Sequence, residues 1–269
     1  MRAGSRLLCL SSLFIGLTGS AACGKPPPSA PVPIAVEGAH DNGTRAFAGF
    51  ELAGKRHGDW RFWYPSGGQE KHGAYANGQE TGTWTYWYED GAVREKAIFV
   101  AGKRHGQRQE WYQDGKPRLR ATYVNGQKHG PWLRWRADET PEVQGAYQDD
   151  QKHGEWRTFD AAGRLRSVET FERGAATGPA RYWDDAGITL RHGTLRDGRM
   201  HGHWTFFQVD GSLHYEGGFV DGVMEGEFVY YWPKRKFKKE EGRYHQGRRV
   251  GRWKEYNVLG KPVREVQYD

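Results

Sequence analysis

A repeat of 24 residues constrains this chain more than any other feature of its sequence. Glycine recurs at that spacing at positions 54, 78, 102, 126, 174, 198 and 222, with Asp150 in the one intervening slot. One residue is inserted in the eighth copy, so the glycine of the ninth copy is Gly247, 25 residues after Gly222. A second glycine follows each slot and is present in all nine copies, at positions 58, 82, 106, 130, 154, 178, 202, 226 and 251. Such self-similarity indicates a repeat architecture in which each unit packs on its neighbours.

Two aromatic slots accompany the glycines. The first slot, two residues after the second glycine, is aromatic in seven copies, and Arg108 and Ala180 are the exceptions. The second slot lies three residues further on and is aromatic in every copy: Trp63, Trp87, Trp111, Trp135, Phe159, Trp183, Phe207, Tyr231 and Tyr256. Only 36% of the chain is hydrophobic and its mean hydropathy is −0.90. We therefore expect aromatic rings rather than a thick aliphatic core to do most of the burying.

Turn signals divide each repeat into two short strands. A turn such as Asp90-Gly91 follows the second ring, and the repeat closes on a pair such as Asn77-Gly78, and both pairs favour tight hairpins. A small residue stands two places before a ring, as in Gly73-Ala74-Tyr75, where it leaves room for an indole from a neighbouring strand. The three-residue spacing of the two rings leaves two arrangements open. Either a bulge realigns them on one face, or they face opposite sides.

The segments Gly54-Lys55-Arg56-His57-Gly58-Asp59-Trp60 and Tyr123-Val124-Asn125-Gly126 resemble MORN repeats, and the 24-residue period resembles the bacterial variant form. The resemblance covers Gly54 to Asp269. It implies an all-β fold, an elongated single-layer antiparallel meander of about nine 24-residue β-hairpin repeats. Some members of the variant family carry an antitoxin label, and eukaryotic members are described as scaffolds or membrane-associated modules.

The N-terminal residues read as an export signal. Arg2 and Arg6 precede an apolar run over 7–17 that is too short to span a bilayer, and Ser20-Ala21-Ala22 offers a small-residue cleavage site. Cys23 follows directly, so this segment resembles the lipobox of bacterial lipoproteins, in which the cysteine is lipidated. Ser20 departs from that motif, and the alternative is cleavage by signal peptidase I, which gives a secreted or periplasmic soluble protein.

The chain is thus predicted to have three parts. Residues 1–22 are a signal peptide, 23–43 hold the lipidated Cys23 and a proline-rich tether, and 44–269 form the repeat domain. The predicted location is the bacterial cell envelope, at the outer membrane or a periplasmic face, with the lipid as the membrane attachment.

The residue types that act in catalysis or bind metals are either scarce in this sequence or recur with the repeat. The repeats contain no cysteine, and the serines lie in no nucleophile motif. Five histidines share one repeat slot (57, 105, 129, 153 and 201), but equivalent positions two strands apart are about 9–10 Å apart, too far to share a zinc ion. The sequence therefore predicts no enzyme activity, no cofactor and no metal site.

Basic residues gather in the turns between repeats, where we expect a ridge along one long edge. The eighth copy, which contains the inserted residue, also has an irregular run of basic residues. The candidate binding residues are Lys55, Arg56, Lys103, Arg104, Lys128, Lys152, Arg248, Arg249, Lys234, Arg235 and Lys236. Such a ridge would attract an acidic protein, anionic lipid headgroups or phosphorylated glycans. The alternative is a solvated turn that keeps the protein soluble. Nucleic acid is not expected as a partner, because the chain carries an export signal.

The sequence favours a non-catalytic, envelope-anchored repeat scaffold that binds an unknown protein partner, with anionic headgroups as a further candidate ligand. One alternative is a carbohydrate- or cell-wall-binding module, because exposed Trp and Tyr rings stack on sugars. A second alternative, an antitoxin-like partner of a toxin, is implied by the family labels alone.

Overall fold

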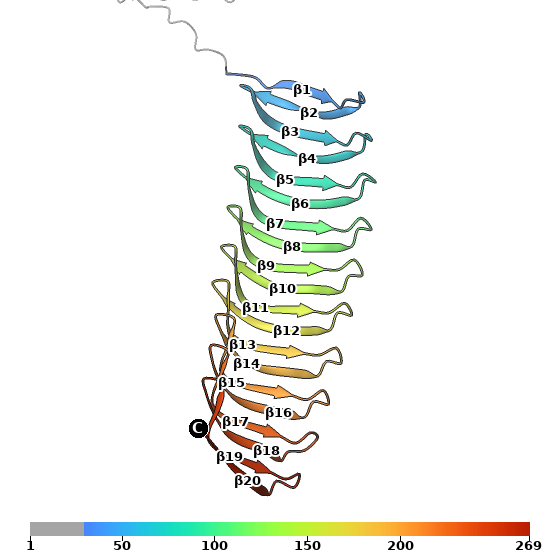
Figure 1. Ribbon diagram of the computed structural model, residues 1–269. Helices are drawn as coiled ribbons and strands as arrows, with labels where there is room; N and C mark the ends of the chain where they lie inside the picture. The colour runs from blue at the N-terminus through green and yellow to red at the C-terminus, as the bar shows by residue number, and fades with distance from the viewer. Residues whose placement is uncertain (1–29) are drawn as a thin grey trace, which may run out of the picture. The chain divides into compact units, whose positions relative to one another are not determined.

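The computed structural model describes residues 30–269, and Pro33–Asp269 form one unit built from β-strands (Figure 1). The predicted signal peptide and Cys23 lie outside the described residues. Within the described part there is no helix with the length and hydropathy needed to cross a membrane. The strands are β1 (Ile34–Ala39), β2 (Arg45–Leu52), β3 (Lys55–Trp63), β4 (Gln69–Ala76), β5 (Gln79–Trp87), β6 (Val93–Val100), β7 (Lys103–Trp111), β8 (Pro117–Val124), β9 (Gln127–Trp135), β10 (Pro141–Gln148), β11 (Gln151–Phe159), β12 (Leu165–Glu172), β13 (Ala175–Trp183), β14 (Thr189–Arg196), β15 (Arg199–Phe207), β16 (Leu213–Val220), β17 (Val223–Tyr231), β18 (Lys238–His245), β19 (Arg248–Tyr256) and β20 (Pro262–Tyr268).

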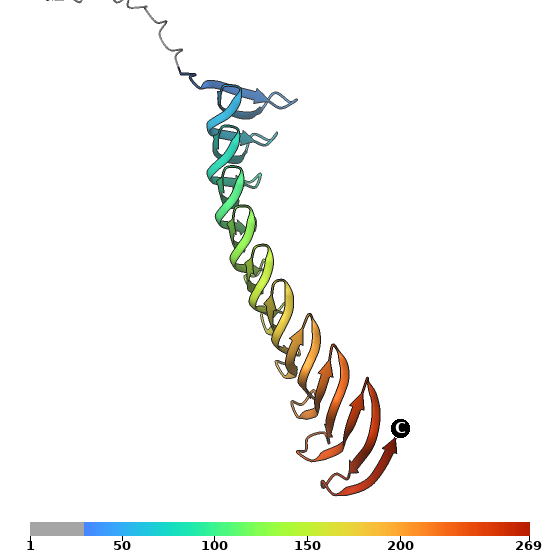
Figure 2. The ribbon, with the colours of Figure 1, turned by 90° about the vertical axis from the view of Figure 1, so that its left-hand side faces the viewer.

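Each strand pairs in antiparallel fashion with the next one in sequence, so the 20 strands form one open meander with β1 and β20 at its ends. The hairpins follow one another along a single-layer sheet, and a view from the side shows the strands curving across it (Figure 2). The predicted fold class is therefore confirmed. Strands β3–β20 are the nine repeats, and the hairpin β1–β2 precedes them. The sheet begins at Ile34, inside the range interpreted as the tether.

The second glycine of each repeat produces the bend in the odd-numbered strands. Gly58 has a φ of +69°, and the same position is positive in all nine copies, a backbone state that favours glycine. At this bulge β3 and β2 change register, since His57 pairs with Phe50 while Arg61 pairs with Ala48. The bend therefore requires glycine in this slot.

The bend carries the first ring across the preceding strand, where a small residue accepts it. A Cβ added to Gly49 would lie 2.3 Å from Cδ2 of Trp60, so the indole rests directly on the glycine backbone. The Trp60 Nε1–H donates a hydrogen bond to the Phe50 carbonyl at 2.9 Å. This arrangement confirms the predicted role of the small residue. It buries the side chains of Trp60, Trp84, Trp204, Phe228 and Trp253 almost completely.

Both long edges of the sheet carry ties between successive repeats. At the turns between repeats, the Gly78 amide donates to the Arg56 carbonyl at 2.8 Å, and the pattern recurs along the edge. At the turns within repeats, the Tyr64 hydroxyl donates to the Trp87 carbonyl at 2.7 Å. Tyr88, Tyr112, Arg136 and Trp232 make the equivalent bond. The turns between repeats, and five of the turns within repeats, are thus held to a neighbouring repeat as well as to their own strands.

Candidate interaction surfaces

The candidate basic residues lie on three different surfaces rather than along one ridge. Neighbouring residues of a strand point to opposite sides, so each Lys/Arg pair at the start of an odd-numbered strand is divided. One group remains exposed on the edge formed by the turns between repeats, the linking-turn edge: Lys55, Lys103 and Arg248. A second group lies on the sheet face that holds the first rings, the first-ring face: Arg56, Arg104, Lys128, Lys152 and Arg249. A third group lies on the edge formed by turns within repeats, the hairpin-turn edge: Lys234, Arg235 and Lys236.

On the first-ring face, cations lie over the buried indoles. The Arg56 guanidinium carbon is 4.5 Å from the Trp60 ring centroid, and that of Arg249 is 4.0 Å from the Trp253 centroid. The Lys152 ammonium is 4.5 Å from the nearest indole centroid. These are cation–π distances. The covered indoles are therefore inaccessible for stacking on a sugar ring, which removes the first-ring row from the carbohydrate-binding alternative.

An ion-paired cluster interrupts the aromatic rows where Arg108 replaces the first ring. Arg108 Nε donates to Glu95 at 2.9 Å and its Nη2 contacts Glu110, while Arg104 Nη2 lies 3.2 Å from Glu95. The side chains of Glu95, Glu110 and Arg108 are only 13%, 15% and 20% exposed. Burial raises the pKa of Glu95, but the hydrogen bonds and charges of Arg108 and Arg104 outweigh it and leave that pKa below its ordinary value. The carboxylate therefore stays ionised at neutral pH.

The second rings lie on the opposite face, which we call the second-ring face. Trp60 and Phe62 stack with centroids 5.8 Å apart, and Trp63, one residue later, points to the other side, where Arg45 lies over it. The two alternatives left open by the sequence are thus decided in favour of opposite faces. All nine second rings are half-buried, and no second layer covers this face anywhere in residues 30–269.

Open hollows lie beside second rings at two places along the sheet, one near its N-terminal end and one over β11–β14. One is lined by Asp59, Arg61 and Trp63, and another by Pro179, Arg181 and Trp183. Each joins a half-exposed indole to a neighbouring guanidinium. This combination suits a protein surface better than a small molecule, because the hollows are shallow and charged.

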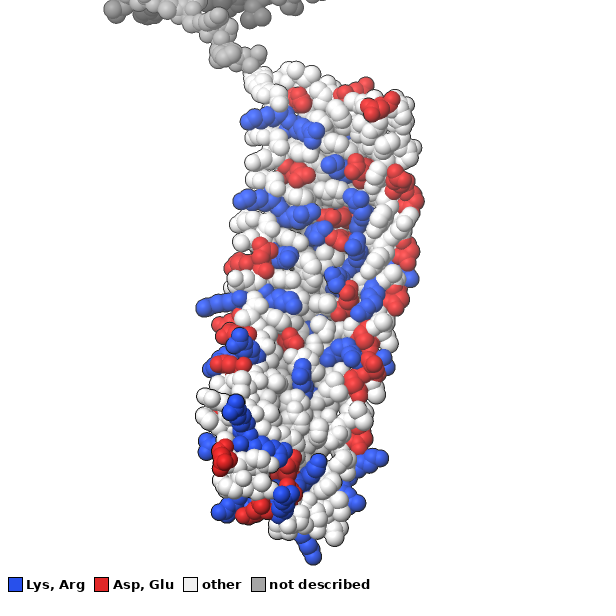
Figure 3. Space-filling model, in the orientation of Figure 1, with Lys and Arg blue, Asp and Glu red and all other residues white. Residues whose placement is uncertain are grey.

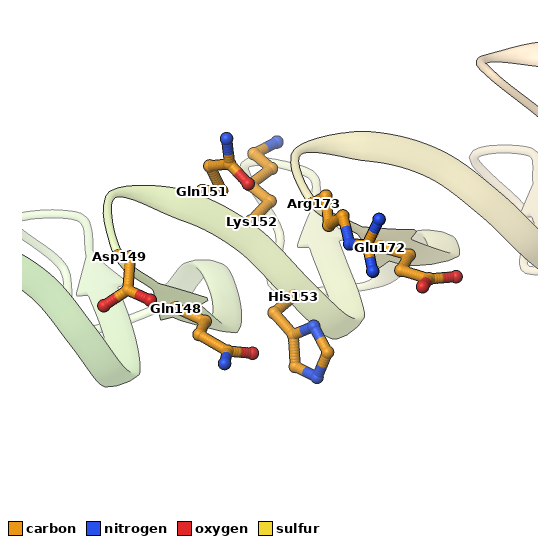
Figure 4. A pocket seen from close by; sticks show the side chains of 7 residues that line it. All are labelled: Gln148, Asp149, Gln151, Lys152, His153, Glu172 and Arg173. Atoms are coloured by element: carbon orange, nitrogen blue, oxygen red, sulfur yellow. The ribbon is translucent and has the colours of Figure 1, made fainter.

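A further hollow lies between the linking turns at 148–151 and 172–175, where Asp150 occupies the glycine slot. Asp150 has a φ of +64°, and its carboxylate accepts the Lys128 amide hydrogen at 2.8 Å, which explains how a non-glycine residue is held there. The side chains that line the hollow carry mixed charge and point in different directions (Figure 4). They do not converge on a common point.

The recurring histidine slot has a structural role at the linking turns. The Asn125 amide donates to Nδ1 of His105 at 3.4 Å, and the His129 ring lies 3.4 Å from the Asp149 carboxylate. Glu225 occupies the same slot and accepts the Gln246 amide hydrogen. In these copies the slot residue therefore supports the next turn, whereas Nδ1 of His57 is buried without a hydrogen-bond partner among the described residues. Among residues 30–269 no group of three or more His, Cys, Asp or Glu is placed to hold a metal ion.

The hairpin-turn edge is acidic over most of its length and basic at its C-terminal end (Figure 3). Its aspartates accept hydrogen bonds from turn amides, as Asp90 does from Ala92 at 2.9 Å, and these bonds keep the pKa of Asp90 below its ordinary value. The last three turns form what we call the C-terminal corner, at 208–212, 232–237 and 257–261. It holds Lys234, Arg235, Lys236 and Lys261 together with exposed apolar residues at 209, 237, 258 and 259.

Sequence reasoning did not identify several of these features. Tyr64, Tyr88 and Tyr112 each stand one residue after a second ring, which the sequence shows. The carbonyl group that accepts each hydroxyl hydrogen lies 23 residues away and could not be recognised in the sequence. The partners of Arg108 lie on two strands, and one of them, Glu95, is 13 residues away from it in the sequence. The apolar residues of the C-terminal corner come from three separate turns, so only the folded sheet brings them together.

Comparison with known proteins agrees with the repeat pattern. The MORN repeat variant model matches residues 80–101 and 104–125, which are parts of two successive repeats. No curated protein matches the chain. Among solved structures, the crystal structure of the GtfA/B complex bound to UDP and GlcNAc shares 11% identity with a TM-score of 0.15, over 49% of this chain and 21% of that one. The crystal structure of TcdB2-TccC3-TEV shares 11% identity with a TM-score of 0.20, over 87% of this chain and 14% of that one.

The chain spans only a small part of either solved structure, and TM-scores this low carry no argument about function. MORN repeats as a class are non-enzymatic modules that bind proteins or membranes. The two matched segments share their strands, bulge glycine and turn pairs with the other copies. The segments 80–101 and 104–125 are therefore similar to the MORN repeat variant, and the other copies repeat the strand and turn pattern of these two segments.

Proposed function

We propose that this protein is a non-catalytic, envelope-anchored scaffold that binds a protein partner through its second-ring face. The observation that carries the proposal is the row of nine half-buried rings on a sheet face that no other part of residues 30–269 covers. Aromatic residues beside arginines are enriched at protein interfaces, where they supply most of the binding energy. Arg61, Arg157 and Arg181 stand beside this row as exposed side chains.

Crosslinking in native envelopes tests this proposal. A photo-crosslinking amino acid at Arg157, on the second-ring face, is expected to capture a discrete protein partner. The same amino acid at Lys103, which is also exposed but lies on the linking-turn edge, serves as the matched control and is expected to capture little. Equal capture at both positions, or capture at Lys103 alone, would contradict binding through the second-ring face.

In the carbohydrate-binding alternative the second rings are the candidate stacking platforms, because six of the seven first-slot rings are buried and Lys128 lies over the seventh, Trp132. It predicts that purified peptidoglycan retains the protein at low salt. Retention together with an absence of protein crosslinks at Arg157 would replace the protein-binding proposal with this one.

Attachment to the envelope is part of the proposal and rests on the sequence around Cys23. A fatty-acid analogue is expected to label the protein metabolically, and Cys23→Ala is expected to abolish the label and to release the protein from membranes. Continued labelling of Cys23→Ala would show that the anchor lies elsewhere. A parent protein that is unlabelled and free of the membrane would favour signal peptidase I cleavage.

A further inference from the structure

Four consecutive second rings differ from the rest of their row on the second-ring face. We call them the open run: Trp87, Trp111, Trp135 and Phe159. Within residues 30–269 no cation and no other aromatic ring lies against any of these four, whereas Arg45 lies over Trp63 and Arg181 lies over Trp183. The rings of the open run are half-buried. Their outer surfaces are therefore available to a ligand.

Short apolar side chains lie between the rings of the open run. Each ring is opposite such a residue on the next strand, in the pairs Trp87–Val93, Trp111–Pro117, Trp135–Pro141 and Phe159–Leu165. Directly opposite residues of an antiparallel pair share one face of the sheet. The residue opposite Trp63 is instead Gln69, and the residue opposite Trp183 is Thr189. The open run is thus an apolar row in which tall rings alternate with short side chains.

The preceding repeat fixes the backbone of each residue in the open run. The carbonyls of Trp87, Trp111 and Trp135 each accept the hydroxyl hydrogen of a tyrosine one repeat earlier, at 2.7, 2.9 and 2.8 Å. The Phe159 carbonyl accepts a guanidinium hydrogen from Arg136 at 2.7 Å. A surface that is already ordered loses little conformational entropy when a ligand binds.

The spacing of the rings selects the conformation of the ligand. Successive rings lie two strands apart, which is about 9–10 Å. A polyproline II helix has three residues per turn and rises about 3.1 Å per residue, so its side chains recur every ~9.3 Å. An α-helix repeats every ~5.4 Å, and side chains on one face of a strand recur every ~6.7 Å. Only the polyproline II helix therefore places an equivalent residue beside every ring.

The indoles of the open run also provide hydrogen-bond donors. The indoles of the first-ring face donate to strand carbonyls, as Trp84 does to Ala74. Within residues 30–269, the Nε1–H groups of Trp87, Trp111 and Trp135 donate to no protein acceptor, and none of the three nitrogens is fully buried. A polyproline II helix has no internal hydrogen bonds, so its carbonyls are available to accept from such donors.

Two cations flank the open run on one side. Lys96 and Arg120 each precede a buried alanine of the first-ring face, so strand alternation places them on the second-ring face, and both pair with Gln109 of β7. Both are exposed, and neither forms an ion pair with a carboxylate in the part of the chain that the structure describes. The aspartates of the hairpin-turn edge lie on the other side of the run. An acidic residue of a ligand is therefore attracted toward Lys96 and Arg120.

We infer that the open run binds a proline-rich, acidic segment of the protein partner in the polyproline II conformation. Aromatic-lined surfaces recognise such segments because the polyproline II helix is formed before binding and loses little entropy. Three ring spacings, roughly 29 Å, correspond to about nine residues of the segment, which lies across strands β5–β12. The inference rests on the proposed binding of a protein through the second-ring face, and it names the chemistry of that partner.

Peptide binding to the full chain tests the inference, with Cys23→Ala in every variant to remove the predicted lipid attachment. The probe is a fluorescently labelled peptide of four Pro-Pro-Glu units. A peptide of four Gly-Ser-Glu units has the same length and charge but is flexible, and it serves as the control. Fluorescence anisotropy is expected to give a dissociation constant at least about tenfold lower for the Pro-Pro-Glu peptide, because its conformation is preformed.

Removing the indole donors tests the open run itself. Trp111→Phe combined with Trp135→Phe keeps the aromatic rings and removes two N–H donors, and it is expected to weaken binding of the Pro-Pro-Glu peptide about tenfold. Phenylalanine is compatible with this slot, since Phe159 and Phe207 occupy it in other copies. The matched control, Trp63→Phe with Trp183→Phe, makes the same change outside the open run and is expected to keep the dissociation constant of the parent.

Equal weakening by the two pairs of substitutions would overturn the inference, and so would equal binding of the two peptides or no binding of the Pro-Pro-Glu peptide. In each of these cases the protein-binding proposal still stands if the crosslinker at Arg157 captures a partner. Failure of capture at Arg157 is the separate result that contradicts the proposed function.

Discussion

Replacing Trp84 with alanine is expected to lower the free energy of unfolding by about 3–5 kcal/mol, the usual cost of emptying a large aromatic site. The Trp84 side chain is fully buried on the backbone of Gly73, and its Nε1–H donates to the Ala74 carbonyl at 3.2 Å. No other layer can collapse into the space, because the sheet is a single layer. Urea unfolding followed by circular dichroism measures the loss.

Trp132→Ala is the matched control for this prediction. Trp132 occupies the same slot but lies over Ala121 instead of glycine, it is only partly buried, and its Nε1 makes no such bond in the described structure. We therefore expect a clearly smaller loss. Equal losses at the two positions would show that contact with the small residue does not determine the stability of a repeat.

A double-mutant cycle isolates the contact between Trp84 and Gly73. A Cβ at Gly73 would lie 2.2 Å from Cδ2 of Trp84, so Gly73→Ala alone is expected to cost about 1–3 kcal/mol. With Trp84→Ala already present the clash is gone, and the same substitution is expected to be neutral or slightly stabilising. Additive effects of the two changes would contradict the proposed packing.

Removing the charge of Arg108 is expected to have the second large effect. Arg108→Met leaves Glu95 and Glu110 largely buried with one of their cations missing, and breaking a buried pair in this way costs about 3 kcal/mol. Arg108→Trp, although it restores the repeat pattern, is expected to be destabilising as well, because both carboxylates keep their charge. Arg120→Met is the matched control, since Arg120 is exposed and lies in the adjacent strand β8.

The pH dependence should distinguish this mechanism from a simple packing defect. In the parent protein the pKa of Glu95 is lowered, so its stabilising contribution is present above the ordinary carboxyl pKa and is lost as the pH falls through the lowered value. Without Arg108, burial dominates and raises that pKa, and protonation then relieves the unpaired charge. The stability difference between parent and Arg108→Met is therefore expected to shrink from pH 7 to pH 4, as measured by urea unfolding. A difference that stays constant with pH would contradict the role of charge.

Much of the fold could be predicted because each residue type that the hairpin needs recurs in up to nine copies of the repeat. The recurring glycine at Gly58, the small residue at Gly73 and the turn pair Asn77-Gly78 each meet a local steric requirement, and such requirements can be recognised in a sequence. The candidate sites were less predictable. The basic pairs such as Lys55 and Arg56 were expected on one ridge, yet strand alternation places one on the edge and the other over an indole.

The sequence by itself determined the period, the hairpins and the pairing of a small residue with a large ring, because all of these depend on residues within one or two adjacent strands. Only the tertiary structure decided which face each ring occupies, which cations are covered, and which turns meet at the C-terminal corner. Those outcomes depend on the register of each strand pair and on the curvature of the whole sheet, which build up over many strands. Residues such as Arg235 and Val258 meet only when the sheet is formed.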